Sequence, residues 1–114
     1  MNRLGIFGET LACIHLLFHG YKIVERNFHS RFGEIDIIAK KHGVTVFVEV
    51  KARSGNMLAD PAYAVDNFKQ QKLIKTAYHY MSRGGDDDFR FDVVEIKRQG
   101  IRLSVRHIED AFQI

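Results

Sequence analysis

Two segments rich in β-branched residues, GEIDIIAKK (residues 33–41) and VTVFVEVKAR (residues 44–53), are separated only by His42 and Gly43. Two strand-like runs that are separated by two residues predict an antiparallel β-hairpin with a tight turn. That turn fixes the register of the two strands. In each cross-strand pair the two residue numbers must therefore sum to 85, as 42 and 43 do at the turn. The sequence therefore predicts that Asp36 lies directly opposite Glu49.

Charged side chains stand at one end of this hairpin, in strands that otherwise suit a buried core. Side chains alternate between the faces of a strand, so Glu49 and Lys51 share the face away from the valines of residues 44–50. Two carboxylates opposite each other repel and need a cation, and carboxylates are ligands of Mg²⁺. Lys51 would offset this charge or orient a metal-bound water. The alternative is a surface patch in which Lys51 only pairs with the acids.

Periodicity and turn residues predict the remaining elements. The predicted order is a helix, three strands, a helix and two strands (αβββαββ), over residues 4–19, 21–28, 33–41, 44–53, 61–83, 89–98 and 101–109. Gly20 is placed to stop the first helix, and Asp60 with Pro61 to start the second. This order predicts an α/β fold in which a mixed sheet has a helix packed on each side. The length suits a single domain over residues 1–114.

Alternation and helical spacing also predict which side chains share a face. Strict alternation puts Ile23 with Glu25, and Ile35 with Ile37. The first helix is predicted by apolar residues at spacings of three and four, with further apolar residues widening the arc: Leu4, Phe7, Leu11, Ile14 and Phe18, then Ile6, Cys13 and Leu17.

Glu9 falls inside the apolar arc of this first helix. A carboxylate is costly to bury there unless it is paired or bound to a metal. The alternative is an acid near the helix start that interacts favourably with the helix dipole.

Composition bounds the class of protein. Hydrophobic residues make up 46% of the chain, which supports a buried core, and no run approaches 18 apolar residues, so no membrane span is expected. Cys13 is the only cysteine and fits a reducing cytoplasm, and the six histidines show no zinc-ligand spacing with it. The net charge of +3 permits a polyanionic partner.

Basic residues flank the hairpin and recur along the second helix. Arg26 and Arg31 precede the hairpin, and Lys69 and Lys72 are three residues apart on one helix face. These side chains suit contacts with a phosphate backbone, although a solvated helix face is the alternative for the lysines. No motif that reads base sequence is visible, which favours recognition of nucleic-acid shape.

Five stretches of the sequence together resemble one family. They are FGETLA (residues 7–12), ERNFHSRFGEIDIIA (25–39), FVEVKAR (47–53), AVDNFKQQKL (64–73) and FRFDVVEI (89–96). The combination resembles the YraN-like family of small bacterial proteins, which is similar to the PD-(D/E)XK nuclease superfamily and its archaeal Holliday-junction resolvases. The resemblance covers nearly the whole chain and implies a restriction-endonuclease-like core.

The resemblance also implies roles for single residues. Asp36 matches the first metal-binding Asp, and Glu49 with Lys51 matches the E-x-K element. Glu9 matches an acidic residue of the first helix, and Lys69 a position that often faces the site. The proline that usually precedes the Asp is replaced here by an isoleucine.

The expected function is therefore metal-dependent hydrolysis of phosphodiester bonds in structured DNA, such as a junction or a flap. Mg²⁺ or Mn²⁺ would be held by Asp36, Glu49 and Glu9, and Lys51 would act on the attacking water or the developing charge. By analogy with two-fold junctions, a homodimer is expected. Two alternatives remain: a nucleic-acid-binding module that does not cleave, and an interaction protein with an acidic partner. The presence of all the expected charged residues favours the enzyme.

Overall fold

The fold has the predicted order of elements. The computed structural model describes residues 3–54, 66–84 and 88–112. Its elements are α1 (Arg3–Phe18), β1 (Lys22–Ser30), β2 (Gly33–Lys41), β3 (Val44–Ser54), α2 (Asn67–Met81), β4 (Asp88–Gln99) and β5 (Arg102–Phe112).

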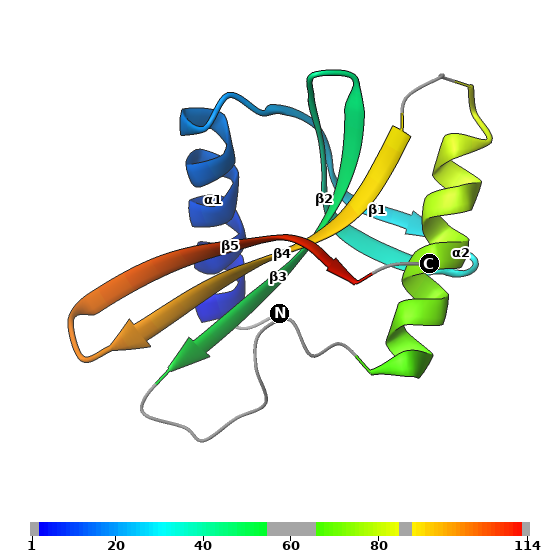
Figure 1. The fold of residues 1–114 in the computed structure, drawn as a ribbon. Coiled ribbons are helices and arrows are strands. Elements are labelled where there is room, and N and C mark those ends of the chain that lie inside the picture. Colours follow the sequence, from blue (N-terminus) through cyan, green and yellow to red (C-terminus); the bar gives the residue numbers. More distant parts are fainter. Residues whose placement is uncertain (1–2, 55–65, 85–87, 113–114) are drawn as a thin grey trace.

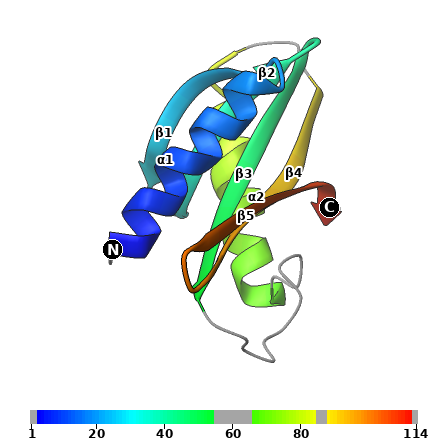
Figure 2. The same ribbon diagram turned by 90° about the vertical axis from the view of Figure 1, so that its left-hand side faces the viewer.

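The described strands form one twisted sheet in the order β1-β2-β3-β4-β5. β3 and β4 run parallel, and the other neighbours pair antiparallel. α1 covers one face of the sheet and α2 covers the other (Figures 1 and 2). The prediction of an α/β fold with a mixed sheet and a helix on each side is confirmed, and this architecture is compatible with a helix–sheet–helix nuclease-like core.

Each helix encloses its own half of the core. On the α1 side, Ala12 and Leu16 pack against Ile37, Val46 and Val48 of the sheet. On the α2 side, a second cluster contains the larger aromatic residues: Phe28, Phe47, Phe91 and Phe112, with Leu73 and Ala77 of α2. None of the helices in the described part of the chain combines the length and apolarity needed to span a membrane.

The apolar stripe that predicts α1 is not the face that the helix buries. Phe7, Ile14 and Phe18 are exposed, whereas Glu9 and Leu16 are buried. Apolar residues surround this helix on both sides, so spacing alone could not identify the inner face. The predicted stop is confirmed, since Gly20 has φ +85°.

Two expectations of strict alternation are wrong. Ile23 lies on the α1 side, whereas Glu25 reaches Arg83 beyond α2 at 4.0 Å, because the β1–β2 register shifts between Ile23 and Glu25. Ile35 packs in the α2-side cluster, whereas Ile37 packs on the α1 side.

The second helix has a well-defined N-cap in the described part of the chain. Asp66 is its N-cap, with an extended backbone, and its side chain accepts a hydrogen bond from the Lys69 N–H. The described helix therefore starts at Asn67, and the predicted start at residues 60–61 lies outside the described residues.

We predict opposite effects of truncating two large apolar residues of α1. Leu16 is 0% exposed and Phe18 is 86% exposed. Leu16→Ala should lower the free energy of unfolding by about 2–5 kcal/mol, because it leaves a cavity under the helix. Phe18→Ala should change it by no more than about 0.5 kcal/mol. Urea denaturation followed by circular dichroism measures both, and equal losses would contradict the described orientation of α1.

Candidate functional site

The β2–β3 hairpin has the predicted register and stops one position short of the acidic pair. His42 (φ 51°) and Gly43 (φ 77°) form the turn, since a two-residue hairpin turn favours positive φ at both positions. From this turn, residues of β2 and β3 pair across the two strands, beginning with Lys41 and Val44 and ending with Ile37 and Val48. All of these pairs have the predicted register, which confirms it.

Asp36 stands where this pairing ends. Its carboxylate Oδ2 accepts a hydrogen bond from the backbone N–H of Val50 at 2.8 Å. A side chain of β2 therefore satisfies a donor of β3 that a regular ladder would have given to a backbone carbonyl. Beyond this point the two strands are no longer paired residue by residue, and Ile35 packs on the α2 side of the sheet.

Glu49 lies on the α2 side of β3 and is 8% exposed. Its carboxylate accepts a hydrogen bond from the ammonium group of Lys69, which lies in the first turn of α2. The capping bond from the Lys69 N–H to Asp66, at 2.8 Å, fixes the start of this helix. Burial works against the positive charge of Lys69, but the bond to Glu49 and its negative charge outweigh burial and raise the pKa of Lys69.

Glu9 reaches the sheet because α1 approaches β3 closely at the preceding residue. A Cβ atom added to Gly8 would lie only 3.2 Å from the Cβ of Ala52. Glu9 is 2% exposed, and its Oε1 lies 3.3 Å from Nη2 of Arg26. The cost of burying this carboxylate is therefore offset by an arginine of β1.

The electrostatics of Asp36 distinguish it from an ordinary paired acid. Burial is the main cause that raises its pKa to about 7, and the negative charge of Glu49 raises it further. The Val50 N–H and Lys69 lower it, and Glu9 adds to the increase. Both of the other candidate carboxylates thus raise the pKa of Asp36, and its carboxyl is only partly ionised at neutral pH.

The carboxylate oxygens of the candidate site meet some of the requirements of a hard cation such as Mg²⁺. Asp36 and Glu49 supply carboxylate oxygens from neighbouring strands, and Mg²⁺ in proteins is often held by one or two carboxylates. Within residues 3–54, 66–84 and 88–112, no group of three or more His, Cys, Asp or Glu side chains is arranged to hold a metal ion. Glu9 as a third ligand stays a prediction, since its carboxylate is paired with Arg26.

The predicted basic residues fall into two groups. Arg26 and Lys69 form ion pairs with the candidate carboxylates Glu9 and Glu49. Arg31 and Lys72 are exposed, and each holds its cationic group over a phenylalanine ring, Phe32 at 4.8 Å and Phe68 at 4.6 Å. That any of them binds nucleic acid stays a prediction.

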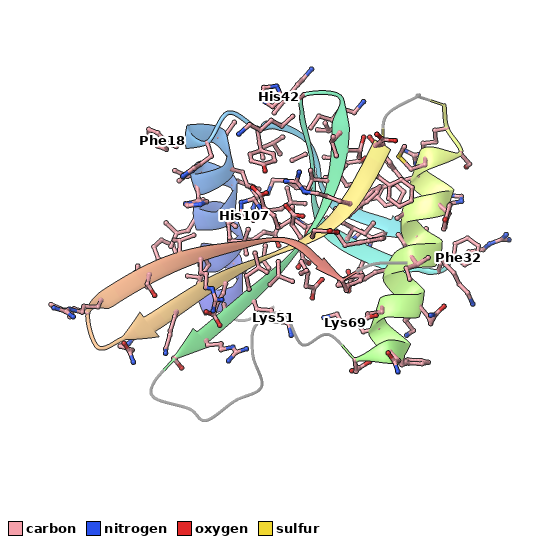
Figure 3. The ribbon with its side chains drawn as sticks, in the orientation of Figure 1. Phe18, Phe32, His42, Lys51, Lys69 and His107 are labelled. Atoms are coloured by element: carbon pink, nitrogen blue, oxygen red, sulfur yellow. The ribbon has the colours of Figure 1, made fainter. Side chains whose placement is uncertain are left out.

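Lys51 lies two residues after Glu49 on β3 and is half-buried. Figure 3 shows Lys51 and Lys69 at the same end of the molecule, where β3 approaches its end and α2 begins. The structure therefore brings Asp36, Glu49 and Lys69 into contact or electrostatic interaction, and it keeps Lys51 on the same stretch of strand.

The sequence did not identify two features of the structure. One is the pairing of Lys69 with Glu49, which depends on how α2 packs and has no local signal. The other is Asp92, which is 0% exposed and accepts hydrogen bonds from Arg90, His107 and the Asp110 N–H. An acid in the middle of the apolar segment FRFDVVEI is a signal that could have identified this second buried carboxylate.

We predict that Asp36 makes the metal-free protein less stable as pH rises. Its folded pKa of about 7 lies above its unfolded value near 3.8, so between these values the folded state binds the proton that the unfolded state has lost. Wild-type stability should therefore fall between about pH 4 and pH 7. Asp36→Asn should remove this fall and be more stable at pH 8 by on the order of 2–4 kcal/mol.

Urea unfolding in chelator from pH 4 to pH 8 measures this difference. Glu25→Gln is the matched control, because Glu25 is also a strand carboxylate but lies near Arg83. Parallel pH profiles for wild type and Asp36→Asn would contradict the raised pKa of Asp36.

The candidate site residues lie within the part of the chain that is similar to a family of bacterial proteins. The model of the uncharacterised protein family UPF0102 matches residues 8–96. A UPF0102 protein of Chlorobium phaeobacteroides is 44% identical over 98% of this chain and 94% of its own length. A UPF0102 protein of Clostridium botulinum is 43% identical over 97% of this chain and 94% of its own length. One of Geobacter metallireducens is 42% identical over 99% of this chain and 94% of its own length. The chain belongs to the uncharacterised protein family UPF0102.

Proposed function

We propose that the chain is a metal-dependent nuclease that hydrolyses phosphodiester bonds in structured DNA, such as a junction or a flap. The observation that carries the proposal is the state of Asp36, a half-buried carboxyl that accepts a hydrogen bond from the Val50 N–H and whose pKa is raised to about 7 by burial and by Glu49. A group this perturbed, placed near a lysine that pairs with its neighbour, is typical of a functional site. A divalent cation between the two carboxylates would remove the repulsion that adds to the effect of burial on the pKa of Asp36.

The residues of the chain have separate roles in this proposal. Asp36 and Glu49 would hold the cation, which when bound supplies charge to stabilise the phosphate and acidify a coordinated water. Lys51 and Lys69 would stabilise negative charge that develops on the phosphate. Arg31 and Lys72, which are exposed, would grip the phosphate backbone on either side.

A second candidate is a nucleic-acid-binding module that does not cleave. Two observations favour it: the ammonium of Lys69 already bonds to Glu49, and the described residues contain no three-ligand metal group. The two candidates differ in whether a divalent cation binds at the acids and in whether any substrate is cut. Binding of the basic surface to an acidic protein would be the remaining explanation if no nucleic acid binds.

The homodimer expected from the sequence stays a prediction. The exposed apolar side chains of α1, among them Phe7, Leu17 and Phe18, offer an uncharged surface for a second copy. Light scattering at micromolar concentration measures the mass directly, and a monomer throughout would remove this part of the proposal.

Divalent cations should stabilise the wild-type protein through Asp36. A ligand that binds only the native state at ten times its dissociation constant adds about 1.4 kcal/mol, which raises the melting temperature of a domain this size by several degrees. Asp36→Asn should abolish the increase seen with Mg²⁺ or Mn²⁺, while Glu25→Gln should retain it. An equal increase in all three proteins would mean that the cation binds elsewhere.

Cleavage should depend on the same acids, whereas binding should not. In Mg²⁺ or Mn²⁺ the wild type should cut branched or flapped DNA, and Asp36→Asn, Glu49→Gln and Lys51→Met should each lower the rate by at least about 100-fold. In chelator these variants should bind the DNA at least as tightly as wild type, because affinity comes mainly from exposed cations and the acids repel phosphate.

The assay is a panel of labelled four-way junction, flap, duplex and single-stranded DNA and RNA, with Glu25→Gln as the active control. Binding without cleavage across the whole panel would favour the non-catalytic module. Absence of both binding and cleavage at low salt would end the nucleic-acid proposal.

A further inference from the structure

A pocket of about 390 Å³ opens beside the candidate site, between the start of β2 and the first turns of α2. Phe68, Lys69 and Lys72 line it from α2, and Gly33 and Glu34 line it from β2. Lys69 is shared between the two places, because its ammonium bonds to Glu49. Whatever fills this pocket therefore lies next to the group on which the proposed chemistry depends.

The walls of this pocket are held together by a close approach of β2 and α2. A Cβ atom added to Gly33 would lie 3.2 Å from Oγ1 of Thr76 and 3.6 Å from the Cβ of Lys72. Thr76 is 0% exposed, and Leu73, which also lines the pocket, is buried in the α2-side core. The pocket is thus formed between two packed elements.

An exposed aromatic ring forms one wall. Phe68 is 73% exposed, and Nζ of Lys72 lies 4.6 Å from the centroid of its ring. Single exposed apolar residues are common and need no explanation. This one differs because it lines a pocket, carries a cation on its ring and directly precedes Lys69. An aromatic ring beside a basic group is the arrangement on which bases of single-stranded nucleic acid stack.

The charges around the pocket select what can enter it. Two lysines, Lys69 and Lys72, are balanced by two acids, Glu34 and Asp66. A phosphate inside the pocket would meet both carboxylates, so the pocket itself does not favour an anion. A flat, neutral group with polar edges fits better, because it can stack on Phe68 while its edges meet charged hydrogen-bonding groups.

We propose that this pocket binds an unpaired nucleobase, which stacks on Phe68 next to the phosphate that is cut. This proposal rests on the proposed nuclease function and specifies its substrate class: a strand with at least one unpaired nucleotide beside the scissile bond. Bases in a continuous duplex are stacked on each other and cannot reach the ring without being turned out of the helix. Single strands, flaps and open junction centres offer such a base at much lower cost.

Tryptophan fluorescence tests the stacking directly, because the chain contains no tryptophan. Phe68→Trp places a reporter in the pocket, and Phe18→Trp is the matched control, since Phe18 is also an exposed aromatic residue of a helix. Figure 3 shows Phe18 on α1, on the opposite side of the sheet from α2. In chelator, a single-stranded oligonucleotide should quench the fluorescence of Phe68→Trp saturably, and a blunt duplex of the same length should quench it far less. Phe18→Trp should respond to neither.

Affinity gives a second, independent readout. Stacking of one base on an aromatic side chain is lost in an alanine variant, so Phe68→Ala should weaken binding of the single strand by about 5- to 150-fold. Phe68→Tyr should restore it, and binding of blunt duplex should change by less than about twofold in either variant. Phe18→Ala should leave all affinities unchanged.

The outcomes separate this inference from the proposed function. If Phe68→Ala binds single strands like wild type, or if duplex quenches Phe68→Trp as strongly as single strand does, the stacking site is wrong. Metal-dependent cleavage of junctions that persists unchanged in Phe68→Ala would then leave the nuclease proposal intact. If quenching is found but Asp36→Asn and wild type are equally unable to cut, the base-binding pocket stands and the nuclease proposal fails.

Discussion

Burial of like-charged carboxylates at one end of the β2–β3 pair is the constraint around which the other elements are arranged. A buried carboxylate requires a donor or a cation, and each of these acids takes its partner from a different element. Asp36 uses the Val50 N–H of β3, Glu49 uses Lys69 of α2, and Glu9 of α1 uses an arginine of β1. The two helices are thus tied by charge to the same end of the sheet, from opposite faces.

Asp92 is a buried acid whose hydrogen-bond partners fully offset the cost of burying its charge. Asp92 is enclosed completely, yet hydrogen bonds from His107 and Arg90 overcome the effect of burial and lower its pKa. Arg90 also donates to the hydroxyl of Tyr21, so this network joins β4, β5 and the residue that directly precedes β1. The burial of Asp92 is therefore explained by its structural role in this network. Asp36 accepts from a backbone N–H but has two acidic neighbours, and this imbalance of charge is what makes its surroundings a candidate site.

The sequence predicted those features that depend on local rules. A two-residue turn determined the register of the hairpin, and Gly20 marked the end of α1. It failed where a local irregularity or a tertiary contact decides the outcome. The register shift in β1 reverses which face Glu25 occupies, and α1 is apolar on both faces, so neither could be read from periodicity. The bond between Lys69 and Glu49 joins residues 20 positions apart and required the packing of α2.

The cost of these acids is itself an argument about function. A protein that only bound nucleic acid would gain nothing from Asp36 and Glu49, because their charges oppose each other and repel phosphate. Asn and Gln at these positions would keep acceptors for the Val50 N–H and for Lys69, without the penalty for burying charge. A raised pKa near neutrality is thus a stability cost, and in the proposed function a bound cation would offset it. In the proposed function the two places would have different ligands: the pocket, with two lysines and two acids in its lining, would take an uncharged base, and the repelling acids would take a cation that lets a phosphate approach.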